Sequence, residues 1–131
     1  MKSVFKILFL ILTAIVLIVI VVFGYRDIPL ESLKMKYGKA PSSFISIDGI
    51  NVHYRDEGLS MDSIPLVLIH GTGSSLHTFE GWTNQLKKTR RVIRMDLPAY
   101  GLTGPFKDRN YTMDNYVEFI HKFLNAKSIH K

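Results

Sequence analysis

The chain has 131 residues, a length that allows one folded domain at most. Its 17 lysine and arginine residues against 11 acidic residues give a formal net charge of +6. The basic residues are scattered singly or in pairs, without the basic stripe and interleaved aromatic side chains typical of nucleic-acid binding, so we expect no nucleic-acid partner. The absence of cysteine excludes disulfide bonds and thiolate chemistry.

An apolar segment near the N-terminus predicts a membrane-spanning helix. Residues 7–23 carry no charge and a single hydroxyl, that of Thr13. As a helix they would extend about 25 Å, close to the hydrocarbon thickness of a thin bilayer. Val4 and Phe5 lengthen the segment because Lys6 can extend its amine toward the headgroups. We therefore expect a single-pass anchor over residues 1–24 that contacts membrane lipid through residues 4–23.

A cleaved secretory signal is the alternative interpretation of this segment. Lys2 and Lys6 would form its positive region, and Val22-Phe23-Gly24 would be a weakly permissive cleavage site. The Ala-x-Ala pattern is missing and the apolar stretch is slightly long for a signal, which favours the anchor. Lys2, Lys6 and the terminal amine favour a cytoplasmic N-terminus and an extracytoplasmic soluble part, although basic residues on the other flank oppose this orientation.

Residues 25–43 are predicted to be a polar linker. The segment contains Pro29 and Pro41 and lacks sustained hydrophobic periodicity, so we expect a tether with one short helical turn around Leu30 to Lys36. Folded structure is expected to begin at Phe44, which makes residues 44–131 the third region of the chain.

Two alternating runs on either side of Asp48-Gly49 predict a β-hairpin, because both turn residues tolerate positive φ. We expect one face of this hairpin to be apolar and His53 to lie on the opposite, solvated face. The apolar members of the two runs are Ile45, Ile47, Ile50, Val52 and Tyr54.

A strand–helix–strand unit is predicted next. Residues 66–69 form a continuous apolar run, typical of a parallel strand that is buried on both faces. A glycine-containing turn follows, then a helix from Leu76 on which Trp82 is expected to pack against the sheet, then a strand over residues 91–96. Thr112 is a good N-cap for a last helix. The apolar stripe of that helix is Met113, Tyr116, Val117, Ile120 and Leu124.

These elements together predict an α/β fold in which a β-hairpin leads into a parallel region covered by helices. The turn at residues 70–75, His-Gly-Thr-Gly-Ser-Ser, is the candidate for chemistry. A strand that ends in such a turn can leave backbone N–H groups unpaired, and such groups stabilise the negative oxygen that develops in acyl transfer. We expect His70 to pack beneath the turn, and Ser74 and Ser75 to begin the following helix. We expect Asp96 to order its loop by accepting backbone N–H bonds.

No cofactor or metal site is predicted. The histidines lack the spacing of a metal pair on one helix face. A dinucleotide fingerprint would need a third glycine where Leu76 stands, and the Gly-Lys-Ser or Gly-Lys-Thr of a P-loop does not occur.

The order of these motifs resembles the N-terminal part of the α/β-hydrolase fold over roughly Phe44 to Leu124. Residues 47–54 resemble that family's opening hairpin, and residues 66–71 resemble its third strand and oxyanion turn. Residues 96–104 resemble its Asp-x-x-Gly-x-Gly-x-Ser loop. Two positions of this loop depart from the pattern: Ala99 replaces the first glycine and Thr103 the serine.

The resemblance implies that the oxyanion donor is the backbone N–H of Thr72, supported by His70, Gly71 and Gly73. The family's nucleophile elbow, Gly-x-Ser-x-Gly, does not occur in the 131 residues, and its acid and base normally follow later still. The chain is therefore interpreted as the N-terminal portion, truncated before the nucleophile elbow, of a membrane-anchored hydrolase of esters or related bonds. We expect this portion to be inactive alone, and a small-molecule substrate belongs only to a complete parent.

Two alternatives stay open, as does the question of whether the chain is itself an enzyme. It could be a non-catalytic, membrane-anchored interaction module that binds a protein partner at the open sheet edge. This edge arises because the family's strand order places the third strand beside a fifth, which the 131 residues do not contain. The chain could also be one half of a split hydrolase.

Overall fold

The computed structural model describes residues 2–24 and 27–129. Its first element, α1 (Lys2–Phe23), has no buried residue. Among the described residues, α1 is the helix that is both long enough and apolar enough to cross a membrane. Its place near the N-terminus fits a membrane anchor or a signal sequence. A second helix, α2 (Leu30–Tyr37), occupies the position of the expected helical turn.

The sheet contains four strands in the order β1-β2-β4-β3. β1 (Ser42–Ile47) and β2 (Ile50–Gly58) form the predicted antiparallel hairpin, and β1 begins two residues before the expected Phe44. Asp48 and Gly49 turn the hairpin with φ values of 51° and 76°, as the Asp-Gly signal requires. β4 (Arg91–Met95) pairs antiparallel with β2 and parallel with β3 (Leu66–Ile69). The α/β architecture predicted from the sequence is confirmed.

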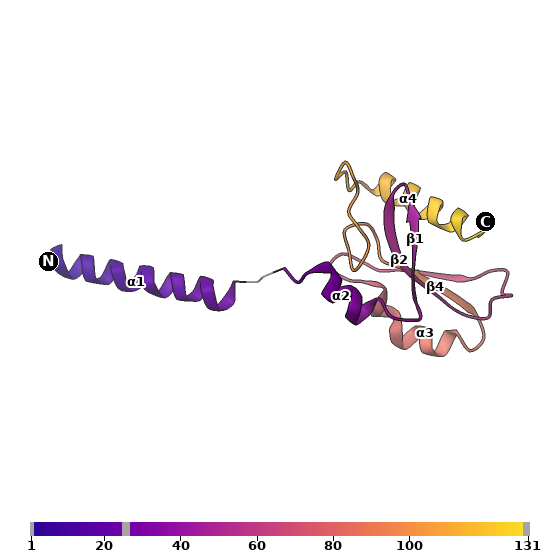
Figure 1. Ribbon diagram of the computed structural model, residues 1–131, viewed down its shortest axis with the longest axis horizontal. Coiled ribbons are helices and arrows are strands. Elements are labelled where there is room, and N and C mark those ends of the chain that lie inside the picture. Colours follow the sequence, from indigo (N-terminus) through magenta and orange to yellow (C-terminus); the bar gives the residue numbers. More distant parts are fainter. Residues whose placement is uncertain (1, 25–26, 130–131) are drawn as a thin grey trace.

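One face of the sheet is covered by α4 (Met113–Ala126), as Figure 1 shows. Phe119 and Phe123 are the buried residues of this helix, whereas Met113 and Val117 are 75% and 58% exposed. The predicted stripe was therefore wrong at these two positions. The helix turns its phenylalanines toward the sheet because an aromatic ring buries more apolar area than a methionine or valine side chain. The core on this side contains Ile47, Ile50, Val52, Ile93, Met95, Phe119 and Phe123.

The other face is covered by a short 3₁₀ helix, η1 (Leu76–Phe79), and by α3 (Glu80–Leu86), on the opposite side of the sheet from α4 (Figure 1). Trp82 is 69% exposed, so the prediction that it packs against the sheet was wrong. The inner side of α3 carries Thr83, which is fully buried, and Glu80, which binds Arg94 of β4. The contact between α3 and the sheet is therefore made by Thr83 and by the Glu80–Arg94 ion pair, and not by the Trp82 indole.

β3 lies at one end of the strand order. All four of its residues are half-buried, so the prediction of a strand buried on both faces was not met. A central parallel strand needs covering on both faces and pairing on both sides. Among the described residues β3 pairs only with β4, which leaves its other edge unpaired.

Candidate functional site

The candidate turn connects the carboxyl end of β3 to η1. Thr72 is exposed in this turn, and no hydrogen bond between described residues uses its backbone N–H. Gly73 has a φ of +70°, and nothing lies within 4 Å of the position that a Cβ atom would take at Gly71 or Gly73. The turn therefore presents an exposed residue whose N–H is unpaired among the described residues, next to open space at both glycines. An unpaired N–H is the property required of an oxyanion donor.

Ser75 begins the next helix, as predicted, whereas Ser74 lies one residue before the N-cap. Ser75 is the N-cap of η1, and its side chain accepts a hydrogen bond from the N–H of His77 at 3.4 Å. The Ser74 and Thr78 hydroxyl groups are hydrogen-bonded to each other.

His70 packs beneath the turn and is 4% exposed. Its Nε2 accepts the N–H of Leu97 at 3.0 Å, so its Nδ1 carries the proton and donates to the Gly71 carbonyl at 2.8 Å. The ring also meets the edge of Tyr100, with centroids 5.4 Å apart. A neutral His70 thus connects the turn after β3 to the loop after β4.

Asp96 is the centre of the hydrogen-bond network at the end of β4. Its Oδ1 accepts the N–H of Leu76 at 2.7 Å, and its Oδ2 accepts the N–H of Leu102 at 2.8 Å. The role predicted for Asp96, to order its loop through backbone bonds, is confirmed. Burial raises the pKa of Asp96, but hydrogen bonds from His53, Leu76 and Leu102 outweigh this effect and lower the pKa below its usual value.

The prediction that His53 is solvated was wrong. Its side chain is fully buried, and its Nδ1 donates to Asp96 Oδ2 at 2.7 Å. The alternating pattern of β2 predicted a strand with one buried face and one solvent-exposed face. In the fold β2 is an inner strand covered on both faces, so the His53 side is buried among Phe44, His77 and Asp96. The Nε2 of His53 is buried without a hydrogen-bond partner among the described residues.

The loop after β4 contains the two positions that depart from the Asp-x-x-Gly-x-Gly-x-Ser pattern, Ala99 and Thr103. Ala99, which replaces the first glycine, has a φ of 69°, a conformation that costs a non-glycine residue roughly 1–2 kcal/mol. Thr103, which replaces the serine, accepts the backbone N–H of His53 at 2.9 Å through its hydroxyl. Gly101 has a φ of 54°, and a Cβ atom there would collide with the Asp96 carboxylate. Glycine is therefore required at this position.

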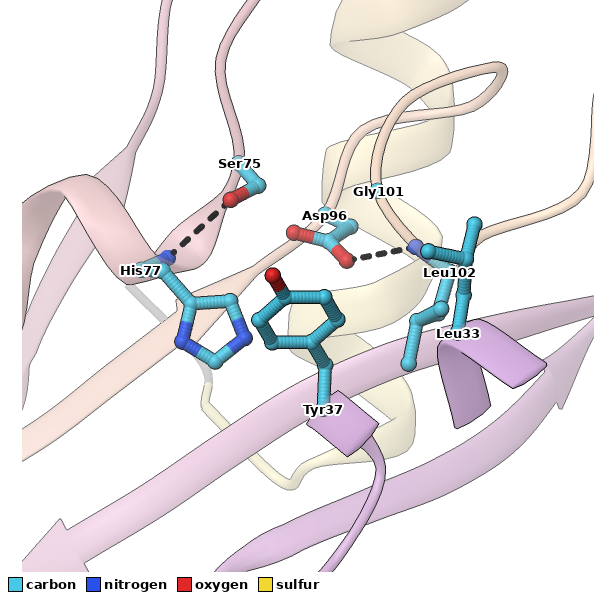
Figure 2. A pocket seen from close by; sticks show the side chains of 7 residues that line it. All are labelled: Leu33, Tyr37, Ser75, His77, Asp96, Gly101 and Leu102. Atoms are coloured by element: carbon cyan, nitrogen blue, oxygen red, sulfur yellow. Dashed lines mark hydrogen bonds between the residues drawn. The ribbon is translucent and has the colours of Figure 1, made fainter. Parts of the chain in front are cut away.

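A cavity of about 310 Å³ lies between α2 and the two loops. Figure 2 shows the Tyr37 ring between His77 and Leu33, with its hydroxyl group on the side of Asp96. The residues that line the cavity are Leu33, Tyr37, Ser75, His77, Asp96, Gly101 and Leu102. A mostly apolar cavity with a few convergent polar groups is typical of a small-molecule site.

His77 contributes an imidazole to this cavity. Burial lowers the pKa of His77, and the positive charge of Arg55 lowers it further. Both effects favour the neutral form of the ring and outweigh the opposing charges of Asp96 and Glu80. Its Nε2 is buried and has no hydrogen-bond partner among the described residues.

The structure thus places all four predicted site residues, His70, Gly71, Thr72 and Gly73, in one turn beside the loop of Asp96. Sequence reasoning missed Leu33 and Tyr37 in the presumed linker, although their i, i+4 spacing at the end of the expected helical turn was a usable signal. It also missed the pairing of His53 with Asp96, because the two residues are 43 positions apart and no local pattern connects them. Within residues 2–24 and 27–129 the structure contains no group of three or more His, Asp or Glu side chains that could hold a metal ion. His130, one of the histidines considered, lies outside the described residues.

Residues 64–131 match the model of the family described as alpha/beta hydrolase fold. More than half of the chain is matched, and the matched part includes the candidate turn and the Asp96 loop. The chain therefore belongs to the α/β-hydrolase fold family.

Relatives with known or assigned activities are hydrolases. The chain is 31% identical over 86 residues to the 2-hydroxy-6-oxo-6-(2'-aminophenyl)hexa-2,4-dienoic acid hydrolase of Metapseudomonas resinovorans, a match that covers 63% of this chain and 28% of that protein. Among solved structures, a putative lipase from Acinetobacter baumannii superimposes with a TM-score of 0.65 at 25% identity, covering 82% of this chain and 36% of that one. The Cif epoxide hydrolase of Acinetobacter nosocomialis superimposes with a TM-score of 0.60 at 25% identity, covering 77% of this chain and 35% of that one.

The chain spans only about a third of the length of these relatives, between 28% and 36%. The matched relatives differ in the bond that they are named for, so the family membership does not by itself specify a substrate.

Proposed function

We propose that these residues form the N-terminal part of a membrane-anchored α/β-hydrolase that cleaves an ester or a related bond. In this proposal α1 is the anchor and the rest of the described chain lies on the extracytoplasmic side. The backbone N–H of Thr72 is the oxyanion donor. The nucleophile, acid and base come from outside the 131 residues, so these residues alone do not turn over substrate.

The observation that carries the proposal is the turn at the carboxyl end of β3. Its Thr72 N–H is unpaired among the described residues, and His70 holds the turn against the neighbouring loop through the Leu97 N–H. An N–H donor that already points to the site of the developing negative charge does not have to move during the reaction. This preorganisation is the basis of oxyanion stabilisation.

A second candidate function rests on the unpaired edge of β3. A half-buried apolar strand with free backbone groups is a template for pairing with another strand. In this alternative the edge binds a protein partner, which is either the remainder of a split hydrolase or an unrelated chain.

The first test is a chromogenic short-chain ester offered to the purified 131-residue chain in detergent micelles. We expect no turnover above the buffer rate, because an oxyanion donor without a nucleophile and base cannot start acyl transfer. A rate typical of a complete catalytic triad would contradict the proposal.

The donor itself is tested in a chimera that continues after residue 126 with the downstream part of the Metapseudomonas hydrolase, assayed on the dienoic acid for which that enzyme is named. Thr72→Pro removes the N–H, whereas Thr72→Ala keeps it and is the matched control. We expect Thr72→Pro to lower kcat by about 10²- to 10³-fold, the usual cost of losing one oxyanion donor. Equal kcat values for two variants with the same circular dichroism spectrum would show that Thr72 is not the donor.

A further inference from the structure

The folded part of the chain gives α2 little support. None of its eight residues is buried, and its N-terminus has no side-chain capping hydrogen bond. Helices shorter than about 12–15 residues are marginal in water unless tertiary packing stabilises them. Ile28 just before the helix, and Leu30 and Met35 within it, are 62%, 49% and 67% exposed. A helix of this length with its apolar side chains in water needs a further surface to cover them.

The length of the connection to α1 indicates where that surface lies. α1 ends at Phe23 and α2 begins at Leu30, so residues 24–29 separate the two helices. Fully extended, this segment reaches about 20 Å at roughly 3.4 Å per residue. If α1 spans the membrane, as proposed above, α2 begins within reach of the headgroup layer.

The charges of the same segment fit a membrane surface. Lys34, Lys36 and Lys39 follow one another within six positions. Lys34 is bonded to Glu31 at 2.9 Å, whereas neither Lys36 nor Lys39 forms an ion pair with a described residue. A basic side chain is attracted to a leaflet that carries anionic headgroups.

We propose that α2 is a second membrane contact, lying in the headgroup layer next to α1. Met35, on the side of α2 that faces away from Leu33 and Tyr37, and Ile28 enter the boundary of the acyl chains. Lys36 and Lys39 meet anionic headgroups. This inference rests on the proposed anchoring of α1. Because Leu33 and Tyr37 of the same helix line the cavity, docking of α2 places the cavity within about one helix diameter, 10–12 Å, of the headgroups.

The test uses the full chain, which has no cysteine, so that single cysteines can be labelled cleanly. Met35→Cys reports on α2, Val16→Cys reports on α1, and Val117→Cys is the matched control. Val117 is an apolar, helical residue of similar exposure to Met35, 58% against 67%, and it lies on α4. Each variant carries a nitrobenzoxadiazole label and is reconstituted in vesicles of phosphatidylcholine and phosphatidylglycerol that contain a nitroxide-bearing phosphatidylcholine.

We expect the nitroxide lipid to quench the labels at positions 16 and 35 several-fold more than the label at position 117. Adding Lys36→Gln and Lys39→Gln should reduce the quenching at position 35 and leave position 16 unchanged. Quenching at position 16 with position 35 equal to position 117 would overturn the docking of α2 while leaving the anchor intact. Loss of quenching at position 16 would overturn both proposals. A disulfide between the unlabelled Met35→Cys chains without lipid quenching would show that a second copy covers α2, and would also overturn the inference.

Discussion

Asp96 joins three segments that are far apart in the sequence. Its carboxylate receives hydrogen bonds from His53 of β2, from the first residue of η1 and from Leu102 in its own loop. All three donors are buried, and a buried donor that loses its acceptor costs about 1–3 kcal/mol. A single side chain therefore controls the position of both loops that form the candidate site.

We expect Asp96→Asn to destabilise the chain by at least about 2 kcal/mol, because the amide offers one acceptor oxygen and turns an NH₂ group toward an N–H donor. Folding lowers the pKa of Asp96, so its stabilisation is complete above the pKa of the unfolded chain and is lost as pH falls through the lower pKa of the folded chain. The variant should therefore lose less stability than the wild type on acidification.

The measurement is urea denaturation in detergent at neutral and acidic pH, followed by circular dichroism. Asp27→Asn is the control, because Asp27 is exposed. An Asp96→Asn variant as stable as Asp27→Asn at neutral pH would contradict the role given to Asp96.

At the scale of elements, charged side chains connect α3 to the sheet. Arg94 of β4 is fully buried and binds Glu57 at 2.6 Å and Glu80 at 2.9 Å. It also donates to the Leu76 carbonyl at 3.2 Å. Burying an ion pair has a large desolvation cost, but removing one partner leaves an uncompensated charge and is strongly destabilising. The ion pairs of Arg94 thus fix the position of α3 on the sheet. Trp82 does not contribute to this contact, because its side chain is exposed.

We expect Arg94→Ala to reduce the free energy of unfolding by about 3–5 kcal/mol. Lys122→Ala should cost only about 0–1 kcal/mol, because Lys122 and its partners Asp48 and Glu118 are exposed and water screens these pairs. Chemical denaturation of both variants in detergent measures the difference. Equal losses would mean that the Arg94 network is no more important than a surface ion pair.

At the scale of the whole molecule, the described residues form a small sheet with one unpaired apolar edge. The strand order leaves one side of β3 free, and its residues are half-exposed. An edge of this kind favours association with another strand. A domain is stable by only about 5–15 kcal/mol, so an apolar edge that stays in contact with water consumes part of a small margin.

We therefore expect a fragment prepared from residues 42–131 to associate in solution or to melt without a sharp transition. Size-exclusion chromatography and differential scanning calorimetry measure these two properties. A monomer that unfolds in one sharp, cooperative transition would show that the free β3 edge costs little.

The sequence predicted the hairpin, the parallel strand pair and the capped helices because each has a local signal. Asp48-Gly49 marks the hairpin turn, the apolar run 66–69 marks a strand, and Thr112 marks the start of α4 by accepting the N–H of Asn115. His53 and Trp82 were misjudged because burial depends on what covers a strand or helix, and those neighbours come from distant parts of the chain.

The sequence by itself determined the apolar N-terminal helix, the order of the strands along the chain and the turn that contains Thr72. These features depend on composition and on the conformational preferences of adjacent residues. Only the tertiary structure decided that His53 meets Asp96, that Arg94 binds α3 and that α2 walls a cavity. The reason is physical: such contacts form between side chains that the backbone brings together only after the sheet has assembled.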